Sequence, residues 1–160
     1  MNRVILTVED HEDNRRILRD LLTSTGFEVI EAVTGEEGVI AAETHHPDLI
    51  LMDVQLPGLD GYEATRRIKA NPALAKTPII MVTSYALSGD DLKAFEAGCD
   101  AVETNSFGSN RIVLGEYELQ DKVLEYNRES ARIARDVAQD YSKPGHPRFV
   151  VGSMGPGTKL

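Results

Sequence analysis

Short apolar runs alternate along this chain with longer stretches in which apolar positions recur every three or four residues. The clearest run covers residues 49–53, where four apolar residues follow one another and a carboxylate, Asp53, ends the run. Pro47-Asp48 precedes the run and Pro57-Gly58 lies shortly after it, and both pairs favour turns. A short apolar run between turns is typical of a strand buried on both faces of a parallel sheet.

Four further runs also predict strands, and amphipathic stretches separate them. The run over 27–31 alternates in the way that is typical of an edge strand. The predicted strands cover residues 3–8, 27–31, 49–53, 78–83 and 100–104. The first predicted helix begins near Asp10 or Asp13, either of which is a candidate cap, and ends at Gly26. Thr34 is the candidate cap of a helix over 35–45, and further helices cover 62–70 and about 88–98. Strands that alternate with single helices predict a doubly wound α/β sheet in the order 2-1-3-4-5.

Carboxylates follow two of the predicted strands at the point where each strand ends. Glu9 and Asp10 come directly after the first strand, and Asp53 ends the third. In the predicted order these two strands are neighbours, and ligands bind at the carboxyl ends of parallel strands where the order reverses. The three side chains are therefore expected to lie together. The alternative for Glu9 and Asp10 is that they only cap the following helix.

Composition and charge restrict the class of protein. The chain has 160 residues, which suits one domain with a sizeable core. Its net charge of −9 argues against binding to nucleic acid or to an anionic membrane surface. We find no apolar run of transmembrane length and no signal-peptide pattern, and we expect a cytoplasmic protein. The single cysteine, Cys99, excludes an internal disulfide and a multi-cysteine zinc site.

Five motifs occur together in this chain, in order and at characteristic spacings, and the ordered set is more specific than any single motif. They are Val8-Glu9-Asp10, Leu51-Met52-Asp53, the Gln-Leu-Pro-Gly-Leu-Asp-Gly stretch over 55–61, Met81-Val82-Thr83-Ser84 and Ala-Gly-Cys-Asp-Ala over 97–101. This set resembles the receiver domain of two-component response regulators over about residues 1–101. The resemblance implies a flavodoxin-like fold, a three-layer α/β/α sandwich around a parallel sheet.

The resemblance also implies a mechanism. Asp53 would accept a phosphoryl group from a histidine kinase or a phosphotransfer protein, and Thr83 would donate a hydrogen bond to a phosphoryl oxygen. Asp10 and Asp53 would hold Mg²⁺ together with the main-chain carbonyl of Gln55 and water. Glu9 would act from the second coordination shell or through a bound water. Hard oxygen ligands suit Mg²⁺, and the metal would neutralise charge on the phosphoryl oxygens.

The receiver pattern breaks after residue 101. Aligned without gaps, the chain has Val102 where the family has an aromatic residue, Asn105 where it has a lysine and Ser106 where it has a proline. The lysine pairs with the phosphoryl group and links it to the switching face, and asparagine carries no charge. We therefore expect that metal binding is retained while phosphorylation is weaker.

A second set of motifs follows in the C-terminal part, over 98–108, 116–119, 127, 131–135 and 148–156. It is similar to an early strand–helix–strand unit of the homocysteine-binding (β/α)₈ barrel of cobalamin-dependent methionine synthase. The tail's own pattern predicts a helix over 117–141, a loop over 142–147 and a sixth strand over 148–152, which would extend the sheet to 2-1-3-4-5-6. The seam between the two resemblances falls within 97–101.

Together these observations predict one α/β domain over 1–160, with a receiver-like part (1–101), a barrel-derived part (102–152) and a tail (153–160). The leading hypothesis is an engineered chimera with a vestigial Mg²⁺ and phosphoacceptor pocket and without enzyme activity, because the cysteines that would hold the zinc of a methyltransferase are absent. The alternative is a working receiver phosphorylated at Asp53 by a histidine kinase. In either case we expect a monomer or a dimer formed through the sixth strand as a sheet edge.

Overall fold

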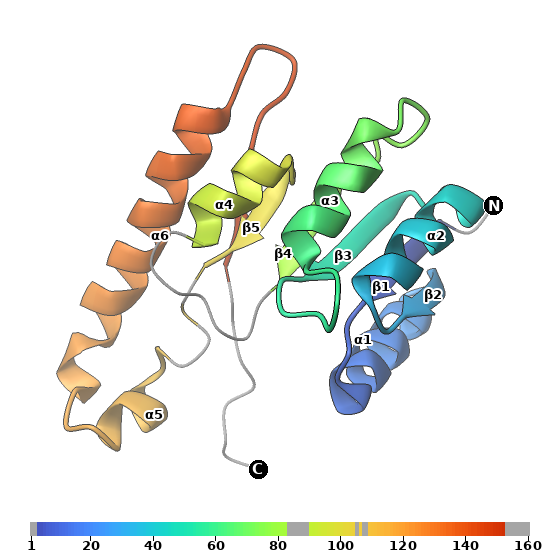
Figure 1. Cartoon of the computed structure of the whole chain (residues 1–160). Coiled ribbons are helices and arrows are strands. Elements are labelled where there is room, and N and C mark those ends of the chain that lie inside the picture. Colours follow the sequence, from blue (N-terminus) through green and yellow to red (C-terminus); the bar gives the residue numbers. More distant parts are fainter. Residues whose placement is uncertain (1–2, 83–89, 105, 107–108, 153–160) are drawn as a thin grey trace.

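Parallel strands form one sheet in the order β2-β1-β3-β4-β5-β6 (Figure 1). The structure is a computed structural model that describes residues 3–82, 90–104, 106 and 109–152. Its strands are β1 (Val4–Val8), β2 (Glu28–Ala32), β3 (Leu49–Asp53), β4 (Ile79–Val82), β5 (Ala101–Glu103) and β6 (Phe149–Val151). Both the strand order and the flavodoxin-like α/β fold agree with the sequence prediction.

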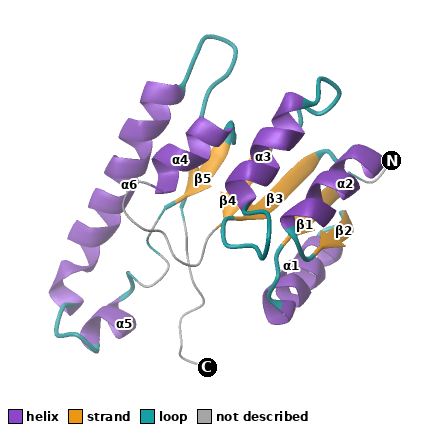
Figure 2. Ribbon diagram, viewed as in Figure 1, coloured by secondary structure: helices purple, strands orange, loops and turns teal. Residues whose placement is uncertain are grey.

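Among the described residues one helix lies in each connection from β1 to β5, while α5, η1 and α6 lie between β5 and β6 (Figure 2). The helices are α1 (Glu12–Ser24), α2 (Gly35–His45), α3 (Gly61–Ala70), α4 (Asp90–Ala97), α5 (Arg111–Gly115), the 3-10 turn η1 (Gln120–Lys122) and α6 (Val123–Tyr141). No helix among the described residues is long and apolar enough to cross a membrane.

Two local predictions were wrong. The N-cap of α1 is His11, whose side chain makes no capping hydrogen bond, and Asp13 lies in the first turn of the helix. The predicted cap of α2 is confirmed, because the Thr34 side chain accepts a hydrogen bond from the backbone N–H of Glu37 at 3.1 Å. The predicted helix over 117–141 begins only at Val123, because Glu118 adopts a positive φ of 59° that no α-helix contains.

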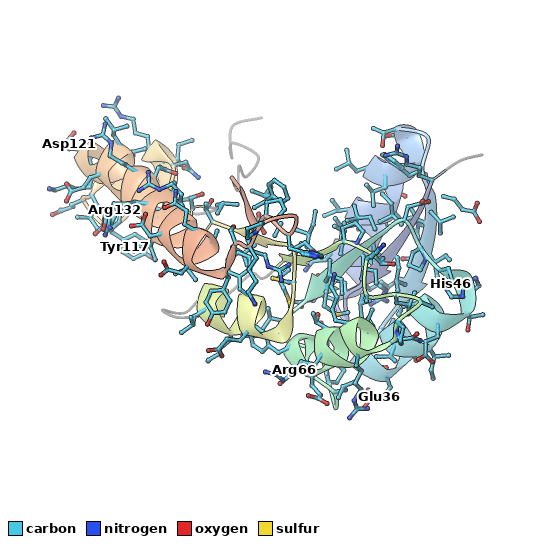
Figure 3. All side chains as sticks on the ribbon, turned by 90° about the horizontal axis from the view of Figure 1, so that it is seen from above. Glu36, His46, Arg66, Tyr117, Asp121 and Arg132 are labelled. Carbon is cyan, nitrogen blue, oxygen red and sulfur yellow. The ribbon has the colours of Figure 1, made fainter. Side chains whose placement is uncertain are left out.

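One face of the sheet is fully covered. In a parallel sheet, residues paired in register point to the same face, and one such row runs Val8, Met52, Met81 and Val102 across four strands, with every member at most 3% exposed. These side chains share one apolar cluster with residues of α2, α3, α4 and α6. Figure 3 shows Glu36 of α2 and Arg66 of α3 on this side of the sheet.

The described residues cover only half of the opposite face. Figure 3 shows α1 on the other side of the sheet from α2 and α3, and α1 packs on β1 and β2, where Arg19 pairs with Glu31 at 3.2 Å. The row of Leu51, Ile80, Ala101 and Phe149 continues this face toward β6, and Phe149 at its end is 57% exposed. We call the β3–β6 part of this face the bare half-face.

An ionic cluster attaches β6 to the sheet. The Asp100 carboxylate accepts from Arg148 Nη1 at 2.8 Å and from Lys69 Nζ at 2.6 Å, and also from the backbone N–H of Ile79 at 3.0 Å. The backbone N–H of Phe149 donates to the Asp100 carbonyl at 2.9 Å. Asp100 therefore joins α3, β4 and the start of β6, a role that the sequence pattern did not indicate.

Candidate metal centre

Three carboxylates meet at the carboxyl ends of two neighbouring strands. Val8 of β1 pairs in register with Met52 of β3, so the next residues along each strand, Glu9 and Asp53, lie side by side. One ligand oxygen each of Glu9, Asp10 and Asp53 lies within 4.8 Å of the others. The predicted convergence of these side chains is therefore present in the structure.

Backbone N–H groups fix two of these carboxylates. Glu9 is 7% exposed, and its Oε1 accepts from the backbone N–H of His11 at 3.1 Å. Asp53 is partly buried, and its Oδ1 accepts from the backbone N–H of Gln55 at 3.3 Å. Asp10 is exposed. The centre therefore opens to solvent on the side of Asp10 and is held rigidly on the side of Glu9.

The surroundings of Asp53 disfavour the charged form of its carboxyl group. Burial raises its pKa from 3.8 to about 6, and the negative charges of Glu9 and Asp10 push the pKa in the same direction. The backbone N–H groups of Gln55 and Val54 lower the pKa but do not cancel these effects. A divalent cation between the three carboxylates would remove their mutual repulsion, and carboxylate oxygens are the ligands that Mg²⁺ prefers.

The loop after Asp53 needs glycine to pass close to the site. A Cβ on Gly61 would lie 2.0 Å from the Asp53 carbonyl oxygen, and Gly58 has a positive φ of 76°. Asp60 then caps α3 by accepting from the backbone N–H of Glu63 at 2.8 Å. The Gly-Leu-Asp-Gly part of the sequence motif is therefore explained by the close return of the chain beneath Asp53.

The remaining predicted site residues are only partly tested. Thr83 and Asn105 lie outside the described residues. Gln55 follows Asp53 and contacts it through its N–H, while the predicted role of its carbonyl as a metal ligand stays a prediction. Sequence reasoning missed Arg15, whose Nη1 donates to the carbonyl oxygens of Glu9 and Asp10. No sequence signal indicated this contact, because both acceptors are main-chain carbonyls.

The acidic cluster lies at the ends of two adjacent strands of a parallel α/β sheet, at the point where the strand order reverses, which is where such sheets bind their ligands. The sequence profile of the response regulator receiver domain matches residues 5–114, and the chain belongs to this family. The match extends beyond the 1–101 range that the motifs indicated and crosses the expected seam at 97–101.

Relatives and solved structures agree with this assignment. Over 101 residues the chain is 42% identical to the polar-differentiation response regulator DivK of Brucella ovis, covering 63% of this chain and 82% of DivK. The receiver domain of the sensor histidine kinase PA1611 of Pseudomonas aeruginosa PAO1 is 35% identical, with a TM-score of 0.62, and 79% of this chain covers 98% of it. That crystal structure holds a magnesium ion in its active-site cleft.

A third comparison concerns the fold alone. The chemotaxis response regulator CheY4 of Vibrio cholerae is 21% identical, with a TM-score of 0.62, and 81% of this chain covers 99% of it. Both solved structures are therefore spanned almost completely by about four fifths of this chain. About a fifth of the chain has no counterpart in either of them.

Proposed function

We propose that this chain is a receiver that binds Mg²⁺ and accepts a phosphoryl group on Asp53 from the phosphohistidine of a histidine kinase or a phosphotransfer protein. The observation that carries the proposal is the convergence of Glu9, Asp10 and Asp53 within 4.8 Å in a chain that belongs to the receiver family. The proposal favours a working receiver over the vestigial pocket of the leading sequence hypothesis.

The chemistry follows from the positions of the carboxylates. A carboxylate oxygen of Asp53 attacks phosphorus, the P–N bond to the histidine breaks, and the leaving imidazole retains its electron pair and takes up a proton. Asp10, Asp53 and the Gln55 carbonyl would hold Mg²⁺, which would neutralise charge at the phosphoryl oxygens. Thr83 is assigned to the phosphoryl oxygen by its position in the family motif. Asn105 in place of the family lysine predicts a lower rate and weaker coupling to a partner.

The test is incubation of the full chain with Mg²⁺ and acetyl phosphate, followed by intact mass measurement and amide NMR. We expect one phosphoryl adduct that Asp53→Asn abolishes, because the variant lacks the attacking oxygen. Asp13→Asn is the matched control: it removes the same charge from the exposed surface of α1 and should leave the adduct unchanged. An adduct on Asp53→Asn would contradict the assignment of the phosphoacceptor.

The pattern of NMR shifts separates the two hypotheses that the sequence left open. Shifts that spread beyond the pocket upon addition of a beryllofluoride mimic would support a receiver that still switches. Mg²⁺-dependent shifts confined to Glu9, Asp10 and Asp53, without any adduct, would support a pocket that is inherited without its activity.

The C-terminal unit carries a separate hypothesis. Its β5–α6–β6 arrangement is a parallel strand–helix–strand unit, which doubly wound sheets and (β/α)₈ barrels both contain, so the arrangement does not favour the barrel resemblance of about residues 98–160 or a chimera over a continued receiver sheet. We propose no methyltransferase activity for it. Cys99, the chain's single cysteine, is buried, and burial raises the pKa of its thiol to about 12, so it is a poor metal ligand. An assay for homocysteine methylation should therefore detect no product.

A further inference from the structure

Arg15 connects helix α1 to the chain segment that carries two of the three carboxylates. Its Nη1 donates to the carbonyl oxygen of Glu9 at 2.9 Å and to that of Asp10 at 2.6 Å. Its backbone N–H donates to the His11 carbonyl at 3.1 Å, as expected in the first turn of the helix. One side chain therefore holds the two peptide planes that flank Asp10, and the first of these planes also adjoins Glu9.

The segment needs this support because the sheet ends just before it. The backbone N–H of Glu9 still donates to the Ala32 carbonyl at 3.1 Å, beyond the last paired residues of β1 and β2. Asp10 follows, is exposed, and leads into the turn before α1. A rotation of the Glu9–Asp10 peptide would move the Asp10 carboxylate away from Asp53, and two charged hydrogen bonds to this peptide and the next oppose that rotation.

The neighbouring arginines on α1 make different contacts. Arg16 pairs with Asp13 at 2.8 Å, with both side chains more than half exposed. Arg19 pairs with Glu31 of β2 at 3.2 Å. Arg15 is therefore distinguished by its contact with the Glu9–Asp10 segment and not by its charge, because Arg16, one residue further along the same helix, has the same charge.

We propose that Arg15 is a positioning residue of the metal centre: it holds the Glu9–Asp10 peptide so that both carboxylates point toward Asp53. The inference rests on the proposed function, since it assigns Arg15 a role in Mg²⁺ binding at that site. Residues that orient metal ligands without touching the metal commonly change metal affinity by 10-fold or more when removed.

The test compares Mg²⁺ binding by the wild-type chain, Arg15→Met, Arg16→Met and Arg15→Lys, measured by titration with MgCl₂ and amide NMR. We expect Arg15→Met to weaken Mg²⁺ binding about tenfold, while Arg16→Met stays within about twofold of the wild type. Arg15→Lys should recover part of the affinity, because an ammonium group can still donate to one of the two carbonyls.

If Arg15 acted only through its charge, Arg15→Met would change the Mg²⁺ affinity in the opposite direction. Removing a positive charge near a cation site reduces repulsion, so both methionine variants would bind Mg²⁺ slightly more tightly if Arg15 acted only through its charge. Weaker binding in Arg15→Met, together with unchanged or tighter binding in Arg16→Met, is therefore specific to positioning. Thermal unfolding of both variants in the absence of Mg²⁺ shows whether a loss of stability could explain the result.

Equal Mg²⁺ affinities of Arg15→Met and Arg16→Met would overturn the inference and leave the proposed function intact. If the wild type bound no Mg²⁺, the proposed function would fail, and the amide shifts of Asp10 and His11 in the metal-free variants would then decide the inference. Shifts at these two residues in Arg15→Met but not in Arg16→Met support the positioning of the segment. Their absence overturns it.

Discussion

Ile79 and Ile80 are consecutive residues of β4 with the same side chain, yet they meet different surroundings. Ile79 faces the covered side of the sheet, where it is fully buried beneath the cluster formed with α2, α3, α4 and α6. Ile80 faces the bare half-face and is only partly buried, in a row with Leu51 and Ala101. In the part of the chain that the structure describes, the sheet therefore has one complete layer of helices and one incomplete layer.

The difference arises from how the chain continues after β5. Parallel crossovers are right-handed, so a chain that adds strands in one direction places successive helices on one face. The strands β3, β4, β5 and β6 follow one another across the sheet, and α6 accordingly joins the face of α3 and α4, with Ala134 and Ala138 buried there. Among the described helices, α1 packs on the opposite face, where Ile17 and Leu21 are each 60% exposed.

The largest expected effect separates the two isoleucines directly. Ile79→Ala should lower the free energy of unfolding by about 3 kcal/mol, because it leaves a cavity in a closed core. Ile80→Ala should cost about 1 kcal/mol, because its side chain loses less buried area and solvent can fill the space. Chemical denaturation of the two variants measures both values. Equal costs would contradict the comparison, since they would mean that both faces are closed in solution.

The second prediction uses Asp53, which lies on the same face as Ile80 and at the rim of the sheet. Its pKa in the folded protein is raised from 3.8 to about 6, so folding favours the protonated form. The contribution of the protonated Asp53 to the free energy of unfolding is fully present below about pH 3.8 and is lost as the pH rises through about 6. Above that pH the charged carboxylate destabilises the fold by about 1 kcal/mol, because solvent reaches the group and screens its charge.

Asp53→Asn should therefore be more stable than the wild type by about 1 kcal/mol at pH 7.5, with a gain that grows between about pH 4 and 6 and is constant above. Unfolding curves at several pH values without metal measure this gain. Mg²⁺ serves as the control: it should stabilise the wild type and reduce the difference, because it binds the folded wild-type centre. A variant less stable than the wild type at pH 7.5 would show that the Asp53 charge is already compensated without metal.

The sequence predicted the elements that depend on local pattern and failed where distant contacts decide. The acidic centre was predictable because Glu9, Asp10 and Asp53 each follow an apolar run whose end the sequence marks. The bare half-face was not, because Ile79 and Ile80 are identical in the sequence and only the placement of the helices on the sheet distinguishes their environments. The contact of Arg15 was not predictable either, because its partners are main-chain carbonyls, which every residue type possesses. The start of α6 depended on Glu118, a residue type without a preference for positive φ.

The smallest expected effect lies at the outer end of the bare half-face. Phe149→Ser should change the free energy of unfolding by less than about 0.5 kcal/mol, because this side chain is 57% exposed. Val150→Ser is the matched control on the same strand: Val150 packs against the covered core, and its loss should cost more than about 1 kcal/mol. Denaturation curves compare the two, and fluorescence of an apolar dye should fall in Phe149→Ser as the exposed apolar surface shrinks. If Phe149→Ser proved as costly as Val150→Ser, the face would be covered in solution, and the contrast between the two sides of the sheet would belong to the isolated chain alone.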